Sequence, residues 1–215
     1  MTIDRTVDGP QILIYHTHSQ EGFADSVPGD PSTTIVGAGE YLAELLRNRG
    51  YKVMHVTSVY DLIDGELDRS EAYSRAEEEI SQILAEHPSI QSVIDLHRDG
   101  VAEGTRLVTE LNGKTMARFM FFNGLSRTRK TGDIDYLANE NQEANLAFSF
   151  QMQLKAAEYY PGLTRRIYLK GYRYNMHLRP RTLLVELGAQ NNTVEEAINA
   201  CDPLAHILDM VLKGE

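Results

Sequence analysis

Residues 11–21 read QILIYHTHSQE, a short apolar and β-branched run that leads directly into two histidines and a glutamate. The run Gln11–Tyr15 predicts a buried strand, and the Gly-, Pro- and Ser-containing segment 16–32 predicts a long loop. In an open α/β sheet, ligands bind at the carboxyl ends of the strands. The polar residues after Tyr15 are therefore the first candidates for a functional site.

Strands and helices alternate along the rest of the chain. Apolar runs predict the other strands, and apolar residues at helical spacing predict the helices. The predicted strands are 51–56, 92–96, 165–169 and 181–187, and the predicted helices are 33–49, 70–86, 139–160 and 193–213. Ser70 is expected to cap the second helix, and Thr193 with Glu196 forms the capping box of the last one.

One hairpin interrupts this alternation. The runs Thr105–Leu111 and Lys114–Phe122 are joined by Asn112-Gly113, a pair that favours a type I′ turn because both positions need positive φ. The second run is apolar on both faces and is expected to be buried. The whole pattern predicts an α/β fold, a three-layer αβα arrangement with a mixed, mostly parallel sheet and an inserted β-hairpin.

The composition is that of an ordinary globular protein. The 215 residues are 42% hydrophobic, and no repeat or linker divides them, so one domain is expected over residues 1–215, with residues 1–10 extended. The net charge of −10 argues against nucleic-acid binding, which depends on neutralising phosphates. Cys201 is the one cysteine, which excludes a disulfide framework, and no run of 18 apolar residues predicts a membrane span.

Three segments carry most of the candidate ligands. They are His16–Glu21, Asp95–Asp99 and Val185–Gly188, and each lies at the carboxyl end of a predicted strand. If these strands are parallel neighbours, the side chains that follow them converge on one site.

The residue types in these segments fit a catalytic zinc site. Two histidines and one carboxylate are a common ligand set for catalytic zinc, which keeps its fourth position open. We assign His18, Glu21 and His97 to the metal. A further carboxylate can take a proton from the attacking water and pass it to the leaving amine, and we assign this general-base role to Glu186.

The assignment of the first histidine has an alternative. His16 shares a strand face with His18 if the strand continues, and both side chains then point at the metal. If the chain turns at Thr17, only His18 binds directly, and His16 lies behind the ligands or contacts substrate. His55, within the second predicted strand, is expected to be structural or solvated.

Both acidic assignments also have a structural alternative. Glu21 lies in a loop and is alternatively a solvated carboxylate. Glu186 lies in a strongly apolar strand, where an unpaired carboxylate is costly to bury. Its alternative role is a structural salt bridge to Arg181 or Arg98.

The other polar residues near these segments are expected to support the site. Asp95 and Asp99 are expected to orient His97 or Arg98, because carboxylates commonly hold metal-bound imidazoles in place. The candidates for steadying an oxyanion, binding a substrate carboxylate or lining the cleft are Arg98, Arg181, Asn175 and His177.

Four stretches of this chain, residues 14–21, 95–99, 174–178 and 184–193, resemble the stage II sporulation protein P family. This family is related to the zinc-dependent N-acetylmuramoyl-L-alanine amidases of bacterial cell walls. The resemblance extends from about Gln11 to Leu212 and implies an amidase-like catalytic domain that requires Zn²⁺. It implies cleavage of the bond between N-acetylmuramic acid and L-alanine in peptidoglycan, and cleavage of peptide cross-links as an endopeptidase.

The resemblance also implies a place and a partner. Members act in engulfment during sporulation, together with stage II sporulation protein D. An N-terminal transmembrane helix normally tethers them outside the cytoplasm, facing the wall. That helix does not occur in this sequence, which therefore resembles a soluble catalytic portion.

Family residues can be carried over to individual positions. In the wider amidase family the first ligand follows the first strand in a Pro-Gly-His context, which here favours His18. The glutamate ligand of the wider family comes from the start of the first helix, but residues 33–36 contain no carboxylate, so Glu21 is expected to serve from the loop. His97 matches the second histidine, and Glu186 matches the catalytic glutamate.

Two other functions are compatible with these residues. A catalytically inactive peptidoglycan-binding scaffold would show weak metal binding or none. A zinc deacetylase or a phosphohydrolase would use the same ligands, with Asp95 and Asp99 available for a second metal.

Overall fold

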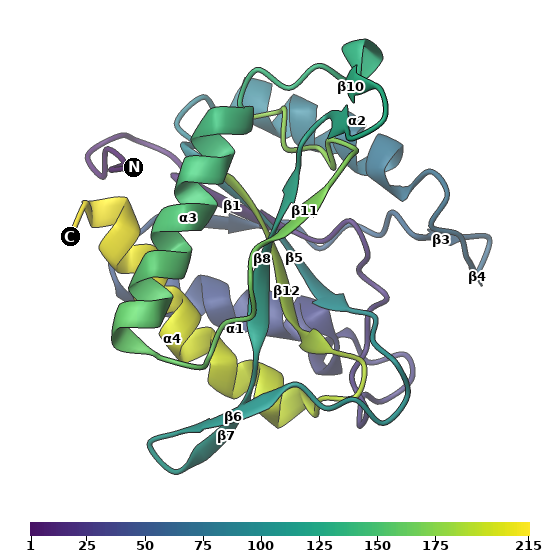
Figure 1. Cartoon of the computed structure of the whole chain (residues 1–215), viewed down its shortest axis with the longest axis vertical. Helices are drawn as coiled ribbons and strands as arrows, with labels where there is room; N and C mark the ends of the chain where they lie inside the picture. The colour runs from purple at the N-terminus through teal and green to yellow at the C-terminus, as the bar shows by residue number, and fades with distance from the viewer.

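The computed structural model describes all 215 residues and is built around a six-stranded sheet with the strand order β11-β8-β12-β5-β1-β2 (Figure 1). The strands are β1 (Ile12–Tyr15), β2 (Val53–His55), β5 (Ser92–Asp99), β8 (Phe119–Gly124), β11 (Tyr168–Lys170) and β12 (Thr182–Ala189). β12, β5, β1 and β2 are parallel, whereas β8 runs antiparallel to β12 and β11 follows the direction of β8. The prediction of a mixed, mostly parallel sheet is confirmed.

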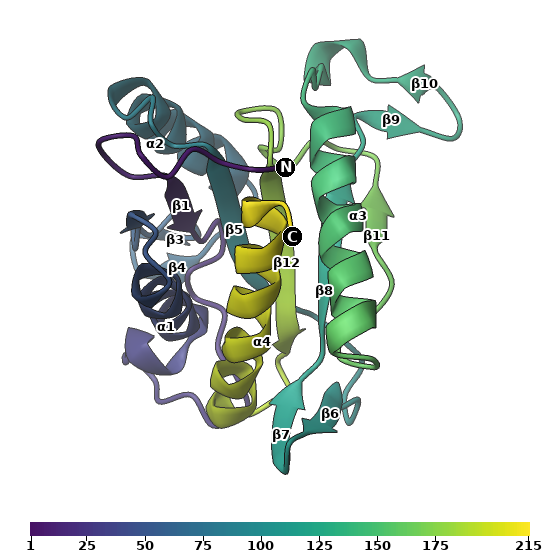
Figure 2. The same ribbon diagram turned by 90° about the vertical axis from the view of Figure 1, so that its left-hand side faces the viewer.

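Helices cover both faces of this sheet and complete the three layers. The helices are α1 (Ile35–Asn48), α2 (Ala72–Glu86), α3 (Gln142–Tyr159) and α4 (Val194–Lys213). α1, α4 and α3 lie side by side across one face, and α2 lies on the other (Figure 2). α1, α3 and α4 enclose the larger hydrophobic cluster together with alternate residues of the central strands, among them Ile14, Ile94 and Val185.

The face under α2 is where the sheet becomes polar. Successive strand residues point to opposite faces, so Val93, Asp95 and His97 of β5 share this face. The buried apolar residues of the smaller cluster are Leu13, Tyr15, Tyr60, Ala72, Ala76, Ile80, Leu84, Ile90 and Val93. α2 thus packs on the beginning of β5, and from Asp95 onward the same face carries polar side chains.

The predicted hairpin is present, but its second strand ends earlier than expected. β6 (Val108–Leu111) and β7 (Lys114–Ala117) form a separate two-stranded sheet, and Asn112 and Gly113 have φ values of 52° and 76°. The hairpin extends away from the body of the molecule (Figure 1). The prediction of one strand from Lys114 to Phe122 is wrong, because β8 begins at Phe119 and pairs with β12 in the main sheet.

The helix ends show one confirmed and one wrong prediction. The capping box of Thr193 and Glu196 is present in both directions. Ser70 does not cap α2: the N-cap position is Glu71, which makes no side-chain capping bond, and the hydroxyl of Ser70 donates to Asp68 instead. None of the helices combines the length and hydrophobicity needed to cross a bilayer.

Small elements that the sequence patterns do not reveal complete the chain. They are β3 (Leu62–Ile63), β4 (Glu66–Leu67), β9 (Arg127–Thr128), β10 (Gly132–Asp133), η1 (Pro31–Thr33) and η2 (Asp135–Leu137). Residues 1–10 contain no helix or strand, although Ile3 is buried and its N–H donates to the carbonyl of Leu212.

Candidate metal centre

His18, Glu21 and His97 offer ligand atoms that all lie within 4.8 Å of one another. Glu21 lies between the two imidazoles, with His18 Nδ1 3.6 Å from its Oε1 and His97 Nδ1 3.5 Å from its Oε2. The two imidazole centroids are 5.1 Å apart. The structure thus brings together the three residues assigned to zinc, and their two nitrogens and one carboxylate fit the donor set of a catalytic zinc site.

His97 is held in place by its own strand and by Asp95. β5 continues to Asp99, three residues beyond the predicted end at Leu96, so His97 is a strand residue rather than a loop residue. Asp95 lies two positions earlier on the same face, with Oδ1 2.8 Å from His97 Nε2. The backbone N–H and the hydroxyl of Thr17 both donate to Asp95. This carboxylate therefore orients the ring so that Nδ1 faces Glu21, as carboxylates commonly do behind metal-bound histidines.

These contacts favour the charged forms of His97 and Glu21 when no metal is present. Burial acts to lower the pKa of His97, but Asp95 and Glu21 outweigh it and raise the pKa well above its usual value. Burial acts to raise the pKa of Glu21, but its bonds to His18 and His97 lower the pKa well below the usual range. An imidazolium on His97 therefore occupies the position where a metal would otherwise provide the positive charge.

Glu21 is anchored deeply, although it comes from a loop. Glu21 is only 3% exposed, so the alternative of a solvated carboxylate is wrong. The backbone N–H of Arg98 donates to Oε2 at 2.9 Å, and Arg69 Nη1 lies 3.4 Å from Oε1. The carbonyl of Glu21 accepts from Ile35 N–H at the start of α1. The loop is thereby tied to both β5 and α1.

His16 points away from this cluster. β1 ends at Tyr15, so the alternation that would put His16 and His18 on one face does not continue. His16 Nδ1 lies 2.8 Å from the carbonyl of Leu96, and its Nε2 lies 2.8 Å from Nε2 of His55. Burial, with the neighbouring His55, lowers the pKa of His16 to about 3. Both ring nitrogens thus contact groups outside the cluster, and the side chain is fully buried, so in this structure His16 lies apart from the three ligands and from any substrate.

Glu186 faces the cluster from the neighbouring strand. It lies opposite His97 in the pairing of β12 with β5, just before an irregularity in β12 that includes Gly188 with φ 68°. Its Oε2 is buried and has no hydrogen-bond partner, and Glu186 forms no ion pair, so the alternative of a salt bridge to Arg181 or Arg98 is wrong. Burial, reinforced by Glu21 and the nearby aspartates, raises the pKa of Glu186 to about 7.

The arginines expected near the reacting atoms do not lie there. Arg181 precedes the first residue of β12, at the opposite end of the strand from the site, and its Nε donates to the carbonyl of Gln91. The guanidinium of Arg98 is bound to the carbonyls of Gly22 and Asp99. Neither arginine is placed to steady an oxyanion, and both act as ties between backbone segments.

Asp99 and His177 contact other groups than the expected ones, whereas Asn175 lines a cavity. The carboxylate of Asp99 contacts Arg165 at 2.6 Å rather than His97 or the guanidinium of Arg98. Asn175 donates to the carbonyl of Tyr73, and His177 Nε2 lies 3.0 Å from Oε1 of Glu77. Asn175 lines a cavity of about 320 Å³ next to the metal cluster, formed by the start of α2 and the segment before β12.

Tyr73 is a site residue that the sequence analysis missed. It lies in the first turn of α2, and its ring is 5.6 Å from that of His18 and 6.4 Å from that of His97, nearly parallel to the latter. It forms one wall of the metal cluster. An aromatic residue at a helix start has no distinctive spacing, so only the packing of α2 against the sheet reveals this contact.

Comparison with known proteins gives a family and a fold. The family model described as "Stage II sporulation protein P" matches residues 3–209. Stage II sporulation protein P of Bacillus subtilis (strain 168) is 25% identical over 217 residues, which covers 94% of this chain and 51% of the relative. The chain therefore spans about half the length of this curated relative.

Solved structures of amidases share the fold at low sequence identity. The CwlD amidase from Clostridioides difficile, solved in complex with the GerS lipoprotein, has a TM-score of 0.59 and 12% identity, and covers 95% of this chain and 100% of its own. An N-acetylmuramoyl-L-alanine amidase from Clostridium difficile 630 has a TM-score of 0.53 and 12% identity, with 95% of each chain covered. The amidase AmiC2 of Nostoc punctiforme has a TM-score of 0.52 and 11% identity, and the match covers 96% of this chain and 97% of the AmiC2 chain.

Proposed function

Because the chain belongs to the stage II sporulation protein P family, we propose that it is a zinc-dependent peptidoglycan hydrolase. The reaction is hydrolysis of the amide bond between N-acetylmuramic acid and L-alanine, with cleavage of peptide cross-links as a second activity. The single observation that carries this proposal is the convergence of His18, Glu21 and His97 beside Glu186 on one face of the sheet.

The donor set supports zinc as the cofactor. His18, Glu21 and His97 would hold the ion through two imidazole nitrogens and a carboxylate, the three-ligand pattern of catalytic zinc enzymes. Asp95 behind His97 supplies the orienting carboxylate that such sites commonly have. When bound, zinc supplies a Lewis acid that polarises the scissile carbonyl and makes water more acidic.

Glu186 has the properties of the proton carrier in this reaction. With a pKa raised to about 7, its carboxyl group exists in both protonation states near neutral pH. The unprotonated form accepts a proton from the attacking water, and the protonated form returns that proton to the leaving amine. Its unpartnered Oε2 is free for both transfers.

The two competing functions are weaker on specific grounds. An inactive scaffold needs no intact proton carrier, yet Glu186 lies next to the three ligands with a buried Oε2 that has no hydrogen-bond partner. A phosphohydrolase with two metals needs a second group of ligands, and Asp95 and Asp99 do not form one, since Asp95 contacts His97 and Asp99 contacts Arg165. A zinc deacetylase shares the chemistry and differs only in the substrate.

Digestion of purified cell-wall sacculi separates these possibilities. The zinc-loaded protein is expected to release peptides that carry a free amino group on L-alanine, detected by mass spectrometry, and shortened cross-links report the endopeptidase activity. Glu186→Gln, loaded with zinc, is expected to release neither, while Glu110→Gln, an exposed carboxylate outside the site, releases both. Release of acetate without peptides would instead identify a deacetylase.

The family also supports a place and a partner for this activity. We assign the protein to wall degradation during engulfment in sporulation, outside the cytoplasm, with tethering by a membrane anchor beyond this sequence. Stage II sporulation protein D is the expected partner on the same peptidoglycan. Co-purification of the two full-length proteins from sporulating cells tests this assignment.

A further inference from the structure

A second cavity, of about 490 Å³, adjoins the metal centre on the other side of Glu186. Glu186 lines it together with β8, β11 and the loop after β5. Strand pairing explains its floor, because Glu186 lies opposite Met120 in β8, and Phe122 lies opposite Tyr168 in β11. The cavity therefore begins at the proton carrier and extends toward the edge of the sheet.

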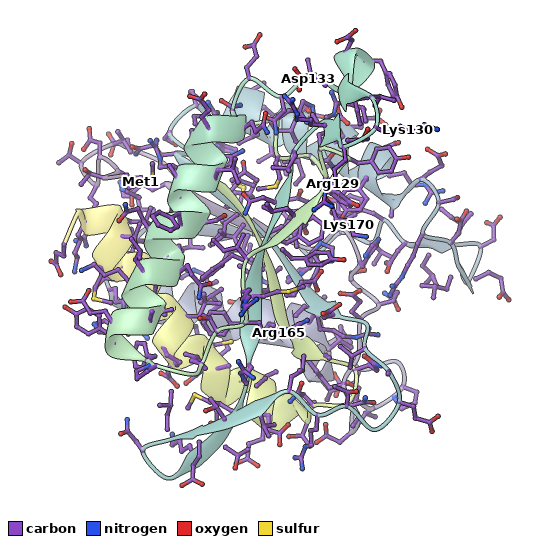
Figure 3. All side chains as sticks on the ribbon, in the orientation of Figure 1. Met1, Arg129, Lys130, Asp133, Arg165 and Lys170 are labelled. Carbon is purple, nitrogen blue, oxygen red and sulfur yellow. The ribbon has the colours of Figure 1, made fainter.

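Two cations line this cavity, Arg165 and Lys170, at either end of the segment that contains β11 (Figure 3). Arg165 uses only Nη1, which contacts Asp99 at 2.6 Å, so its Nε and Nη2 have no protein partner. The ammonium of Lys170 lies 5.4 Å from the ring centroid of Tyr168 and forms no ion pair. Guanidinium and ammonium groups with free N–H donors are the usual partners of carboxylates in proteins.

Other cations near the site are already engaged. Arg98 binds two backbone carbonyls, Arg69 lies beside Glu21, and Arg173 contacts both oxygens of Glu77. Arg165 is also paired, with Asp99 of the same lining, but two of its N–H groups remain free, and Lys170 forms no ion pair. These free donors mark the cavity as the part of the cleft that can bind a carboxylate.

The cavity of about 320 Å³ on the Tyr73 side has the opposite character. It is lined by Tyr73, Tyr172 and Tyr174, and its one arginine is neutralised by Glu77. Aromatic rings without free charge suit an uncharged ligand face. The ring centroids of Phe122 and Tyr174 are 4.8 Å apart, and these two rings form the wall between the two cavities. A substrate lying across the metal centre is thus offered an aromatic side and a side with free cationic N–H donors.

We propose that Arg165 and Lys170 form a carboxylate subsite that binds the peptide part of the substrate. This inference rests on the proposed function, because it assigns the two sides of the scissile amide to the two cavities. The peptide side carries a free carboxylate close to the L-alanine, and the glycan side lies against the tyrosines. The protein should therefore distinguish peptides whose second residue has a free α-carboxylate from peptides in which that group is an amide.

Two synthetic substrates test this subsite. Both are N-acetylmuramoyl-L-alanyl dipeptides, and they differ only in whether the carboxylate of the second residue is free or amidated. The zinc-loaded protein is expected to hydrolyse the free acid with a kcat/KM about 10- to 100-fold higher, the range of one or two charge-assisted hydrogen bonds. Arg165→Gln and Lys170→Gln should each reduce this ratio, and the double variant should abolish it.

The ratio between the two substrates within one variant is independent of how much protein is folded. Arg166→Gln is the matched control, since Arg166 is exposed, forms no ion pair and does not line the cavity. It should leave the ratio unchanged. An unchanged ratio in the double variant, or equal rates for both substrates in the wild type, overturns the subsite while leaving the proposed hydrolysis intact.

Binding of the released dipeptides provides a second measurement that needs no catalysis. By calorimetry with the zinc-loaded protein, the free-acid dipeptide should bind about 10- to 100-fold more tightly than its amide. This preference should disappear in the double variant. If it persists there, the carboxylate binds the metal or another group, and the proposal fails. If the dipeptides bind as expected but neither substrate is hydrolysed, the proposed function fails and the subsite remains.

Discussion

Glu186 and His97 are direct neighbours in the pairing of β12 with β5, and their side chains share the polar face of the sheet. Adjacent strands lie about 4.8 Å apart, so this pairing brings the proposed proton carrier next to a proposed metal ligand without the use of a flexible loop. The rigidity of two central strands holds the pair. The proposed function therefore depends on strand register, and a shift of one residue would turn Glu186 to the face covered by α1, α3 and α4.

The first prediction separates metal binding from proton transfer. Glu186→Gln keeps the size of the side chain but cannot accept a proton, and Glu186 is not one of the three ligands. The variant is expected to retain about one zinc per chain and to lose at least about 100-fold in kcat, the usual range for a general base. Elemental analysis and hydrolysis of sacculi measure the two quantities. Loss of zinc would show that Glu186 is a ligand instead.

A second prediction concerns the pH dependence of activity. The pKa of Glu186 is raised to about 7, and only the unprotonated carboxylate accepts a proton from water. kcat/KM should therefore rise with pH and level off above the pKa of Glu186. A bound dication favours the carboxylate, so in the zinc enzyme this rise is expected at or below pH 7. A profile that falls across this range would exclude Glu186 as the base.

The same raised pKa predicts an effect on stability in the metal-free protein. A carboxyl whose pKa is raised on folding binds more protons in the folded state, so stability decreases as pH rises from about 4.5 to about 7. Above that range the cost approaches about 3 kcal/mol. Glu186→Gln removes this cost, so its Tm relative to wild type should be higher at pH 8 than at pH 5. Thermal unfolding in the presence of a chelator at both pH values measures the difference, which should be absent for Glu110→Gln.

Zinc binding is predicted to release protons. His97 carries a proton in the metal-free protein because Asp95 and Glu21 raise its pKa, and a metal ligand must be a neutral imidazole. Zinc affinity should therefore increase as pH rises. Calorimetry in buffers of different ionisation enthalpy counts the protons released. Asp95→Asn should release fewer protons and, because Asp95 orients the ring, weaken zinc binding by about 10- to 100-fold.

The main features of the site could be predicted because parallel strands end at one edge of a sheet. His18 and His97 could be predicted from that rule. Glu186 could be predicted because it is a charged residue in an otherwise apolar strand. The same rule places Arg181 at the far end of β12, away from the site, because it precedes the first residue of that strand. Contacts made across layers, such as those of Tyr73 from α2 or Arg165 beside β8, have no sequence spacing that reveals them.

The final prediction concerns His16, which the structure places behind the metal centre. A Cβ atom on Gly39 of α1 would lie 2.5 Å from two ring atoms of His16 and 2.9 Å from Nε2 of His55, closer than packed atoms approach. Gly39→Ala should therefore lower the free energy of unfolding by about 1–3 kcal/mol, the usual cost of overpacking. His16→Ala should retain zinc, in contrast to His18→Ala, because His16 bonds to Leu96 and His55 rather than to the ligands.

Combining the two changes tests the packing argument directly. His16→Ala removes the ring that the new methyl group would strike, so Gly39→Ala should cost less in the His16→Ala background than in the wild type. Denaturant unfolding of the four proteins gives this difference, since residues in contact are expected to be non-additive. Strictly additive effects, or loss of zinc in His16→Ala, would mean that His16 is not wedged between α1 and β5 and takes part in metal binding after all.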